Sequence, residues 1–305
     1  MKDSKIIKVD DDLESIVYRK NLFVKIATDA REYETDVVPT PEFLEKMKEI
    51  GADIFTFLER KWCNAVTNPS KSWAKIDDNI ALLTITTYDD WWKSISKKTR
   101  NMVRKAEKSG VKTVVAEPDQ KLAEDMWKIY NETPIRQERA FPAYGISLET
   151  VKKYVLSSQN CTYIGAYFQD ALVGFIKLVH GKNITIMSQI LSMQKHLDLA
   201  LNNALIAKAI EVCANKREKW FMYARMGNHP TLDRFKENNG FRKFPLTRYC
   251  VPLNKKGELA IKLGLHRRVE DVLPAPIKYR LIPIYNWASR AKIKIMLHSK
   301  PKQKY

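Results

Sequence analysis

The alternation of apolar and polar positions predicts a mixed α/β protein between residues 111 and 252. Strands are expected at 111–116, 162–168, 171–180, 184–191, 219–225 and 241–253, the last interrupted by Pro245. Helices are expected at 120–131, 148–156, 196–214 and 230–238. Gln169-Asp170 and residues 181–183 are short enough for tight turns, so the three strands that they join should pair antiparallel.

The first 110 residues are expected to add a further α/β region. Strands are predicted at 15–27, 53–58 and 80–87, a helix at 41–50, and a loop at 64–78. A second helix should begin at Thr87, which forms a capping box with Asp90, and end near Gly110. Its apolar face is formed by Trp92, Ile95, Met102, Val103 and Ala106.

The opposite face of this 87–110 helix is positively charged. Five cations follow one another at spacings of four, three, four and four residues: Lys93, Lys97, Arg100, Arg104 and Lys108. Like charges in this arrangement repel, and an anionic partner such as tRNA or a lipid surface would offset the repulsion. A solvated helix face is the alternative interpretation.

Positive charge is a property of the whole chain. The 305 residues carry a formal net charge of +18, which favours phosphate-bearing cofactors, tRNA or an acidic membrane surface as partners. Residues 277–305 contain eight Lys or Arg and no acidic residue, interleaved with apolar side chains that include Trp287 and Tyr285. This composition is typical of a basic tail at a membrane interface or on RNA, or of a packed helix with a charged end.

The cysteines and the hydropathy of the chain indicate the cellular compartment in which the protein is expected. Cys63, Cys161, Cys213 and Cys250 are scattered without metal-ligand spacing, so neither a metal site nor disulfide partners are expected. The charged N-terminal residues are unlike a signal peptide, and no uncharged run reaches the length of a membrane span. A cytoplasmic protein is expected, with peripheral attachment to a membrane as an alternative.

The order of predicted elements resembles the GNAT acyltransferase fold over residues 111–252. Asn228, followed by Phe235-Lys236-Glu237 and Gly240-Phe241, is similar to the end of the GNAT pattern. Residues 96–110 resemble the segment that opens the acyltransferase domain of Fem-type peptidoglycan-bridge aminoacyltransferases, the nearest branch together with related acetyltransferases.

The resemblance implies a fold class and a domain plan. The fold would be a mixed, mainly antiparallel sheet flanked by helices, with an N-terminal α/β extension. Residues 1–90 would form that extension, a degenerate GNAT-like half being one interpretation. Residues 91–253 would form the acyltransferase domain with its basic leading helix, and residues 254–305 a basic tail.

The resemblance also implies a donor site, for acyl-CoA or an aminoacyl-tRNA. The donor would lie between strands 184–191 and 219–225, with its phosphates at the start of helix 196–214. The implied binding residues are Gln194, Lys195, His196, Asn202 and Asn228. Ala200 and Asn202 stand at the positions of two family glycines, and the added bulk of Asn202 is easier to reconcile with a tRNA donor.

Candidate catalytic groups follow from the chemistry of acyl transfer to an amine, which needs a base and donors for the oxyanion. The candidates are Glu138, Tyr223, His229 and Tyr249. Each also has a structural interpretation: Glu138 could pair with a neighbouring arginine, Tyr223 could be a packed strand aromatic, and His229 could cap a helix. Phe235 stands where many GNAT enzymes place an acidic Tyr, and it cannot protonate a leaving group.

Two functions from different classes remain. The first is an N-acyltransferase that moves an acyl or aminoacyl group onto an amine-bearing acceptor. The alternative is a catalytically inactive GNAT-like scaffold that binds RNA or an anionic membrane, which the replaced glycines and Phe235 favour.

Overall fold

The computed structural model describes residues 5–7, 16–21, 23–29, 32, 39–59, 70–136, 139–181, 184–227 and 230–267. They fall into two units. The first comprises the described residues up to Leu82, those within Met222–Lys236 and those from Phe241 onward, and the second comprises those within Leu83–Phe221 and Glu237–Gly240. The first boundary between the two units therefore falls between Leu82 and Leu83. The division of the chain into domains at 1–90, 91–253 and 254–305 stays a prediction.

The first unit is a sheet with a helix on each face. Its strand order is β1 (Lys5–Ile7), β2 (Ile16–Asn21), β3 (Val24–Asp29), β4 (Ile54–Glu59), β13 (Arg242–Pro252) and β5 (Ala74–Thr84). Among these described strands, β3 and β4 pair in parallel and the other neighbours pair antiparallel. Phe55 and Phe57 of β4 pack with α1 (Pro41–Glu49), whereas Ile54 packs with α8 (Lys255–Lys262), as the two-residue period of a strand requires.

Three sequence predictions in this unit are corrected. The strand expected at 15–27 is two antiparallel strands, β2 and β3, with a turn after Asn21. The loop expected at 64–78 is wrong for residues 74–78, because β5 begins at Ala74. Residues 64–69 of that predicted loop lie outside the described residues.

The interruption expected at Pro245 is also wrong, since β13 is continuous through it. Pro245 lies opposite Asn79 of β5, while the pairing of β13 with β4 begins only at Thr247. Among the described residues, Pro245 therefore has a strand neighbour on one side only, where its missing N–H is tolerated.

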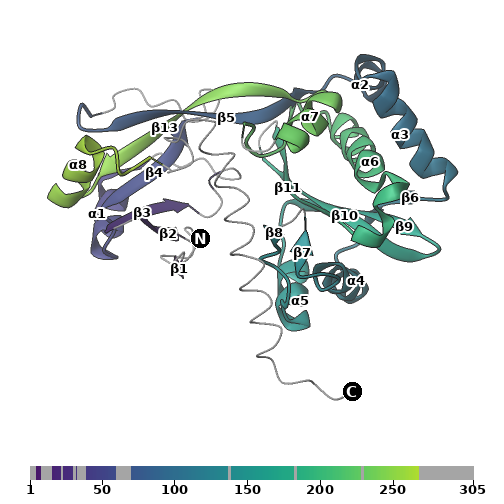
Figure 1. The fold of residues 1–305 in the computed structure, drawn as a ribbon, viewed down its shortest axis with the longest axis horizontal. Coiled ribbons are helices and arrows are strands. Elements are labelled where there is room, and N and C mark those ends of the chain that lie inside the picture. Colours follow the sequence, from purple (N-terminus) through teal and green to yellow (C-terminus); the bar gives the residue numbers. More distant parts are fainter. Residues whose placement is uncertain are drawn as a thin grey trace. The chain divides into compact units, whose positions relative to one another are not determined.

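The second unit is a three-layer arrangement around a sheet in which β6, β9, β10 and β11 pair antiparallel. The strand order is β12 (Trp220–Met222), β11 (Ile184–Ser192), β10 (Ala171–His180), β9 (Cys161–Phe168) and β6 (Lys112–Ala116). Helices α4 (Gln120–Tyr130) and α5 (Leu148–Leu156) pack together on one face, and α6 (Leu201–Asn215) covers the other (Figure 1). Helices α2 (Tyr88–Ser94) and α3 (Lys97–Lys108) pack on α6.

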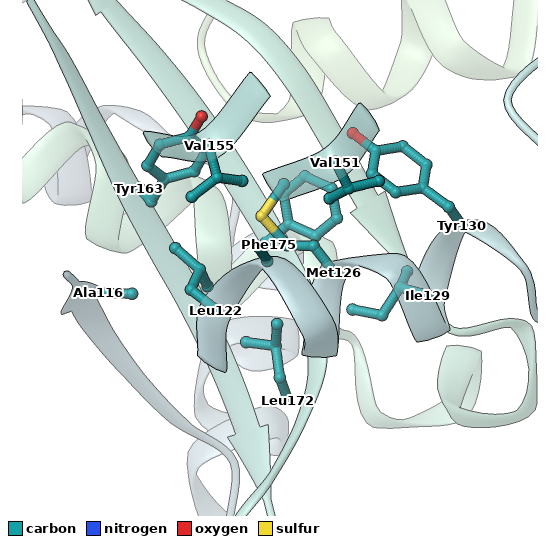
Figure 2. Packing of buried hydrophobic residues seen from close by; sticks show 11 residues of the cluster. Ala116, Leu122, Met126, Ile129, Tyr130, Val151, Val155, Tyr163, Leu172 and Phe175 are labelled. Carbon is teal, nitrogen blue, oxygen red and sulfur yellow. The ribbon is translucent and has the colours of Figure 1, made fainter. Parts of the chain in front are cut away.

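The core under α4 and α5 holds this half of the unit together. Phe175 of β10 is fully buried and lies among Met126, Val151 and Tyr130, as Figure 2 shows. Tyr130 meets Phe175 edge to face with ring centroids 5.7 Å apart. Burying such side chains contributes about 1.5–3 kcal/mol each, so this cluster fixes the position of the end of α4.

Several predicted elements of the second unit are confirmed. Helix α5 and strand β10 have the expected bounds, and Ser147 caps α5 through the backbone N–H of Thr150. Gln169 and Asp170 both have positive φ angles, 51° and 61°, as a two-residue hairpin turn needs. A short hairpin, β7 (Ile135–Arg136) and β8 (Arg139–Ala140), lies between α4 and α5 in the chain.

Two helices are interrupted where continuous helices were expected. The 87–110 helix is α2 followed by α3, because Ile95 is extended and Ser96 caps a new helix through the N–H of Thr99. The 196–214 helix is a 3₁₀-helix, η1 (Gln194–Leu199), then α6 from Leu201, with left-handed Ala200 between them.

The strand expected at 219–225 is also shorter than predicted. Strand β12 ends at Met222, and Ala224 has a φ of 47°. The chain therefore leaves the strand direction before Arg225, so Tyr223 and Arg225 do not belong to the strand. Helix α7 (Pro230–Asn238) has its expected bounds.

Candidate functional site

The connection between β11 and α6 carries four of the residues predicted to bind a donor. Gln194, Lys195 and His196 lie in η1, and Asn202 lies in the first turn of α6. Neither helix is capped by the side chain of its own N-cap residue, which is Met193 for η1 and Ala200 for α6. Because the first N–H groups of a helix have no partner within it, the start of α6 carries a partial positive charge suited to an anion.

Ala200 has an unusual backbone conformation. Its φ and ψ are 56° and 33°, the left-handed region, and its side chain is buried. That conformation costs an L-residue about 1–2 kcal/mol and suits glycine. The residue at the position of the family's first glycine thus adopts a backbone that glycine would adopt without strain.

Glu132 binds the beginning of the same connection. It follows the C-terminus of α4 closely, and its carboxylate accepts hydrogen bonds from two consecutive backbone N–H groups. Oε2 lies 2.7 Å from the nitrogen of Gln194, and Oε1 lies 3.2 Å from that of Lys195. The backbone donors of two predicted donor-binding residues are therefore occupied by a carboxylate of the chain itself.

Arg136 holds this carboxylate in place. Its guanidinium NH2 group donates to Glu132 over 3.1 Å and to the carbonyl of Ile129 over 2.7 Å, and NH1 donates to the carbonyl of Ser192 over 2.6 Å. The side chain is 8% exposed and lies over the ring of Phe141. Burial lowers the pKa of Arg136 and nearby Glu132 opposes that shift, so the buried cation is matched by an anion.

Polar side chains also line the end of β11. The Ser192 hydroxyl donates to the side-chain oxygen of Asn202 over 2.7 Å, which ties the strand to the first turn of α6. The Tyr130 hydroxyl donates to Gln189 over 2.6 Å, and burial raises the pKa of Tyr130 to about 12. Ser188 is an extra residue in β11, because Lys177 pairs with Gln189 and Leu178 with Met187. Such bulges often lie beside active sites.

Tyr223 and Arg225 lie in the first unit. The Tyr223 ring meets Phe241 edge to face, and burial raises the pKa of its hydroxyl to about 12. Arg225 Nε lies 2.8 Å from Asp78 Oδ1, and Arg248 binds the other oxygen of Asp78 at the same distance. Arg225 thus anchors one of the chain's own carboxylates.

Tyr249 also belongs to the first unit, within the cluster that includes Phe57 and Trp73. Its ring stacks on Phe57 with centroids 5.4 Å apart, and it is 3% exposed. Burial, with the nearby charge of Glu59, raises the pKa of Tyr249. Its packing suits a core aromatic, and its role as a catalytic residue stays a prediction.

Lys236 is a buried lysine that the sequence did not single out as a site residue. It is 1% exposed, its Nζ donates to the carbonyl of Arg225 over 2.8 Å, and it lies 4.5 Å from the centre of the Tyr223 ring. Burial lowers the pKa of Lys236 to about 8. Buried ionisable groups with pKa values near neutrality are candidates for function, and the only sequence signal was its place in the Phe-Lys-Glu motif.

Three predicted residues, Glu138, Asn228 and His229, lie outside the described residues, as does the 277–305 tail. Their roles stay predictions. Of the others, the structure brings Gln194, Lys195, His196 and Asn202 together in the second unit. It places Tyr223 and Tyr249 in the first unit.

The five cations of the predicted positively charged helix face have different surroundings. Lys93, Lys97, Arg104 and Lys108 are exposed, and Arg104 lies 5.4 Å from the centre of the Trp92 ring. Arg100 is different, because its NH1 group donates to the carbonyls of Trp92, Lys93 and Ile95 at the end of α2. Arg100 therefore completes the α2–α3 junction.

Within the part of the chain that the structure describes, no group of three or more His, Cys, Asp or Glu is placed to hold a metal ion. None of the described helices is long and apolar enough to cross a membrane. Cys161, Cys213 and Cys250 are free thiols, and Cys63 lies outside the described residues.

Comparison with known proteins identifies the fold. No protein-family model matches the sequence, and no curated protein matches it significantly. Among solved structures, the chain is similar to the C-terminal domain of a protein named as a lysylphosphatidylglycerol synthetase from Agrobacterium fabrum. The TM-score is 0.54 at 14% identity, over 85% of this chain and 87% of that one. The chain has a GNAT-like fold.

Two further structures are similar to the same extent. L-PGS from Bacillus licheniformis has a TM-score of 0.54 at 13% identity, covering 87% of this chain and 90% of that one. FemX also has a TM-score of 0.54, at 12% identity, with coverages of 85% and 90%. These similarities confirm the predicted fold class and the predicted likeness of the fold to the Fem-type branch. At 12–14% identity they show the fold alone.

Proposed function

We propose that this protein is an N-acyltransferase that moves an acyl or aminoacyl group from an acyl-CoA or an aminoacyl-tRNA to an amine. The amine nitrogen attacks the carbonyl carbon of the donor and forms the new C–N bond. The C–S or C–O bond to the thiol or ribose then breaks, and the amine proton passes to a base or to solvent. The acceptor is an amine-bearing molecule.

One observation carries the proposal. The β11–α6 connection has a left-handed residue followed by a helix N-terminus that its own N-cap residue, Ala200, does not cap. These are the backbone features that an acyl donor's phosphate or carbonyl needs, and they are present although the sequence lacks the glycines. The GNAT-like fold also supports the proposal, although less specifically, because one fold can carry several different activities.

Lys236 is the catalytic candidate that we add to Glu138, Tyr223, His229 and Tyr249. An ammonium group removed from water can stabilise the oxyanion that forms on the attacked carbonyl. Phe235 precedes it and cannot donate a proton. The leaving group therefore takes its proton from elsewhere, either from solvent or from one of the remaining candidates.

A ligand panel tests the donor assignment. The full chain is incubated with acetyl-CoA, CoA and total tRNA, and the melting temperature and calorimetric heat are measured. Stabilisation by CoA esters supports a thioester donor, and stabilisation by tRNA alone, lost steeply with salt, supports an aminoacyl-tRNA donor. No response to any ligand would contradict both donor assignments.

A second candidate function is a non-catalytic scaffold on RNA or an anionic membrane. The observation that favours it is the set of exposed cations on α2 and α3, namely Lys93, Lys97, Lys98, Arg104, Lys105 and Lys108. In this case the protein binds tRNA or acidic vesicles but consumes no acyl donor. A cytoplasmic location, with peripheral attachment to a membrane, belongs to both proposals.

A further inference from the structure

A second group of polar side chains lies in the second unit, away from the β11–α6 connection. Its members come from strand ends and from the end of α6, namely Thr162, His180, Thr185, Lys216 and Glu218. Thr185 lies near the start of β11, whereas Ser192, which bonds Asn202, ends that strand. At about 3.3 Å per residue these two positions are about 23 Å apart, so the group is separate from the predicted donor site.

His180 is at the centre of this group. Its Nε2 lies 2.8 Å from the Thr162 hydroxyl oxygen and 3.2 Å from Lys216 Nζ. Because an ammonium group donates and cannot accept, Nε2 is the accepting nitrogen and Nδ1 carries the ring proton. Nδ1 then donates to the Thr185 hydroxyl oxygen over 2.9 Å. The ring therefore presents an unprotonated nitrogen to the Thr162 hydroxyl, as a general base does.

Glu218 holds the ring in this orientation. Its Oε1 lies 3.7 Å from His180 Nδ1, and its carboxylate accepts a hydrogen bond from the wholly buried Thr185. Burial raises the pKa of Glu218, a shift that the Thr185 hydrogen bond and the charge of Lys216 oppose. A carboxylate in this place stabilises the imidazolium that forms when the histidine takes a proton.

Lys216 adds a cation beside the Thr162 hydroxyl. Its Nζ lies 3.5 Å from the Thr162 oxygen. Lys216 is exposed and Thr162 is partly exposed, so a molecule in solution can reach the hydroxyl. An ammonium group beside a nucleophile can stabilise the oxyanion that forms on an attacked carbonyl. The group thus brings together a hydroxyl, a base, an orienting acid and a cation.

We propose that Thr162, His180 and Glu218 form a second reaction centre, which hydrolyses carboxylic esters with a good leaving group. Thr162 is the nucleophile, His180 the general base, and Glu218 the acid that orients it. Esters are preferred to amides, because an alcohol leaves more readily than an amine. The inference does not rest on the proposed function, since it uses none of the residues assigned to the donor or to acyl transfer.

The reaction proceeds in two steps. The Thr162 oxygen attacks the ester carbonyl and forms a C–O bond while His180 Nε2 takes the hydroxyl proton. The C–O bond to the leaving alcohol breaks, and His180 returns the proton to that alcohol. Water then attacks the acyl-threonine with the help of the same base, which releases the acid and restores the hydroxyl.

Hydrolysis of 4-nitrophenyl acetate by the full chain tests the proposal. Thr162→Val removes the hydroxyl and should lower kcat/KM about 100-fold. Thr162→Ser keeps a hydroxyl and should stay within about tenfold of wild type. Thr84→Val makes the same chemical change at an exposed threonine of the same unit and should have no effect. Thermal melting of each variant checks that it folds.

The pH profile separates His180 from histidines at the surface. Burial lowers the pKa of His180 to about 4, with a smaller contribution from the charge of Lys216. The base is therefore unprotonated above that pH, and the enzyme-dependent rate should stay level between about pH 5 and pH 8. A histidine with an ordinary pKa would lose most of its activity as the pH falls through about 6.5.

Three results would overturn the proposal. One is a folded wild type that hydrolyses the ester no faster than Thr162→Val does. Another is a rate that falls with the ordinary pKa of histidine, and the third is a folded Thr162→Ser that is as inactive as Thr162→Val. If Thr162→Val does not fold, Lys216→Met takes its place, because Lys216 is exposed. It should lower kcat/KM about tenfold relative to Lys153→Met, a change at another exposed lysine of this unit, and an equal rate would overturn the proposal.

Discussion

At the scale of single residues, Ala200 links the sequence to the backbone that the site needs. It stands at the position of a family glycine, and its backbone adopts the left-handed conformation that glycine favours. Alanine has the smallest side chain that can occupy this region at a modest cost, whereas a β-branched residue is strongly disfavoured there. The position therefore restricts side-chain size rather than demanding glycine.

This restriction gives a stability prediction. Ala200→Gly relieves strain but loses a buried methyl group, so the free energy of unfolding should stay within about 1 kcal/mol of wild type. Ala200→Val should lower it by more than about 2 kcal/mol, because a β-branched side chain is forced into the left-handed region. Urea unfolding of both variants measures the difference, and equal effects would show that backbone strain is not the limiting factor.

Lys236 predicts a dependence of stability on pH. Its pKa falls from 10.5 to about 8 on folding. Between these values the unfolded chain binds more protons than the folded chain, so the native state gains stability as the pH rises through that interval.

The matched variant is Lys236→Met, which keeps the shape and removes the charge. The stability of wild type relative to this variant should rise by about 2 kcal/mol between pH 7 and pH 9.5. Chemical denaturation at a series of pH values measures it, because the titration of all other groups cancels in the difference. If the stability difference between wild type and Lys236→Met does not change with pH, burial does not lower the pKa of the Lys236 amine.

At the scale of elements, helix caps and hairpin turns were predictable because their signals are local. Thr87 caps α2 through the N–H of Asp90, and Gln169-Asp170 joins β9 to β10, as expected. The breaks at Ser96 and Ala200 were not predicted, because apolar periodicity continues across both of them. Tertiary contacts decide such positions, as with Arg100, which holds the end of α2 from the next helix.

The junction of α2 and α3 changes the expected effect of charge reversal. Arg100 belongs to the predicted positively charged helix face, so its replacement would be expected to affect anion binding alone. Because Arg100 donates to three carbonyls, Arg100→Ala should lower the free energy of unfolding by about 1–2 kcal/mol.

Reversal at exposed positions separates binding from stability. The double change Lys97→Glu and Lys105→Glu should leave stability within about 0.5 kcal/mol and lower tRNA affinity and its salt dependence. Filter binding at several salt concentrations and thermal melting provide the two readouts. Unchanged tRNA affinity at low salt would exclude this face as the anion-binding surface.

At the scale of the whole molecule, the sequence predicted the fold better than the site. The order of strands and helices after residue 111 was sufficient to identify a GNAT-like fold, because each element follows local periodicity. The pairing of Glu132 with Gln194 and Lys195 joins residues 62 and 63 positions apart, and no local pattern encodes it. Lys236 was missed as a site residue for the same reason, because its burial depends on distant packing.

The net charge of +18 bears on the choice between the two proposed donors. A strongly basic surface raises the local concentration of a polyanion such as tRNA and accelerates its association. The effect of charge on a small nucleotide thioester is weaker, since fewer phosphates are involved.

The most direct test of the central claim is transfer of label from aminoacyl-tRNA to an amine. Bulk tRNA charged with labelled amino acids is incubated with the protein and a pool of primary amines, and label that survives mild base is counted. The ester of the donor hydrolyses under these conditions, whereas the amide product does not. The account predicts base-stable label with wild type and little with Lys236→Met. No base-stable label with folded wild-type protein, from either aminoacyl-tRNA or acetyl-CoA, would contradict it.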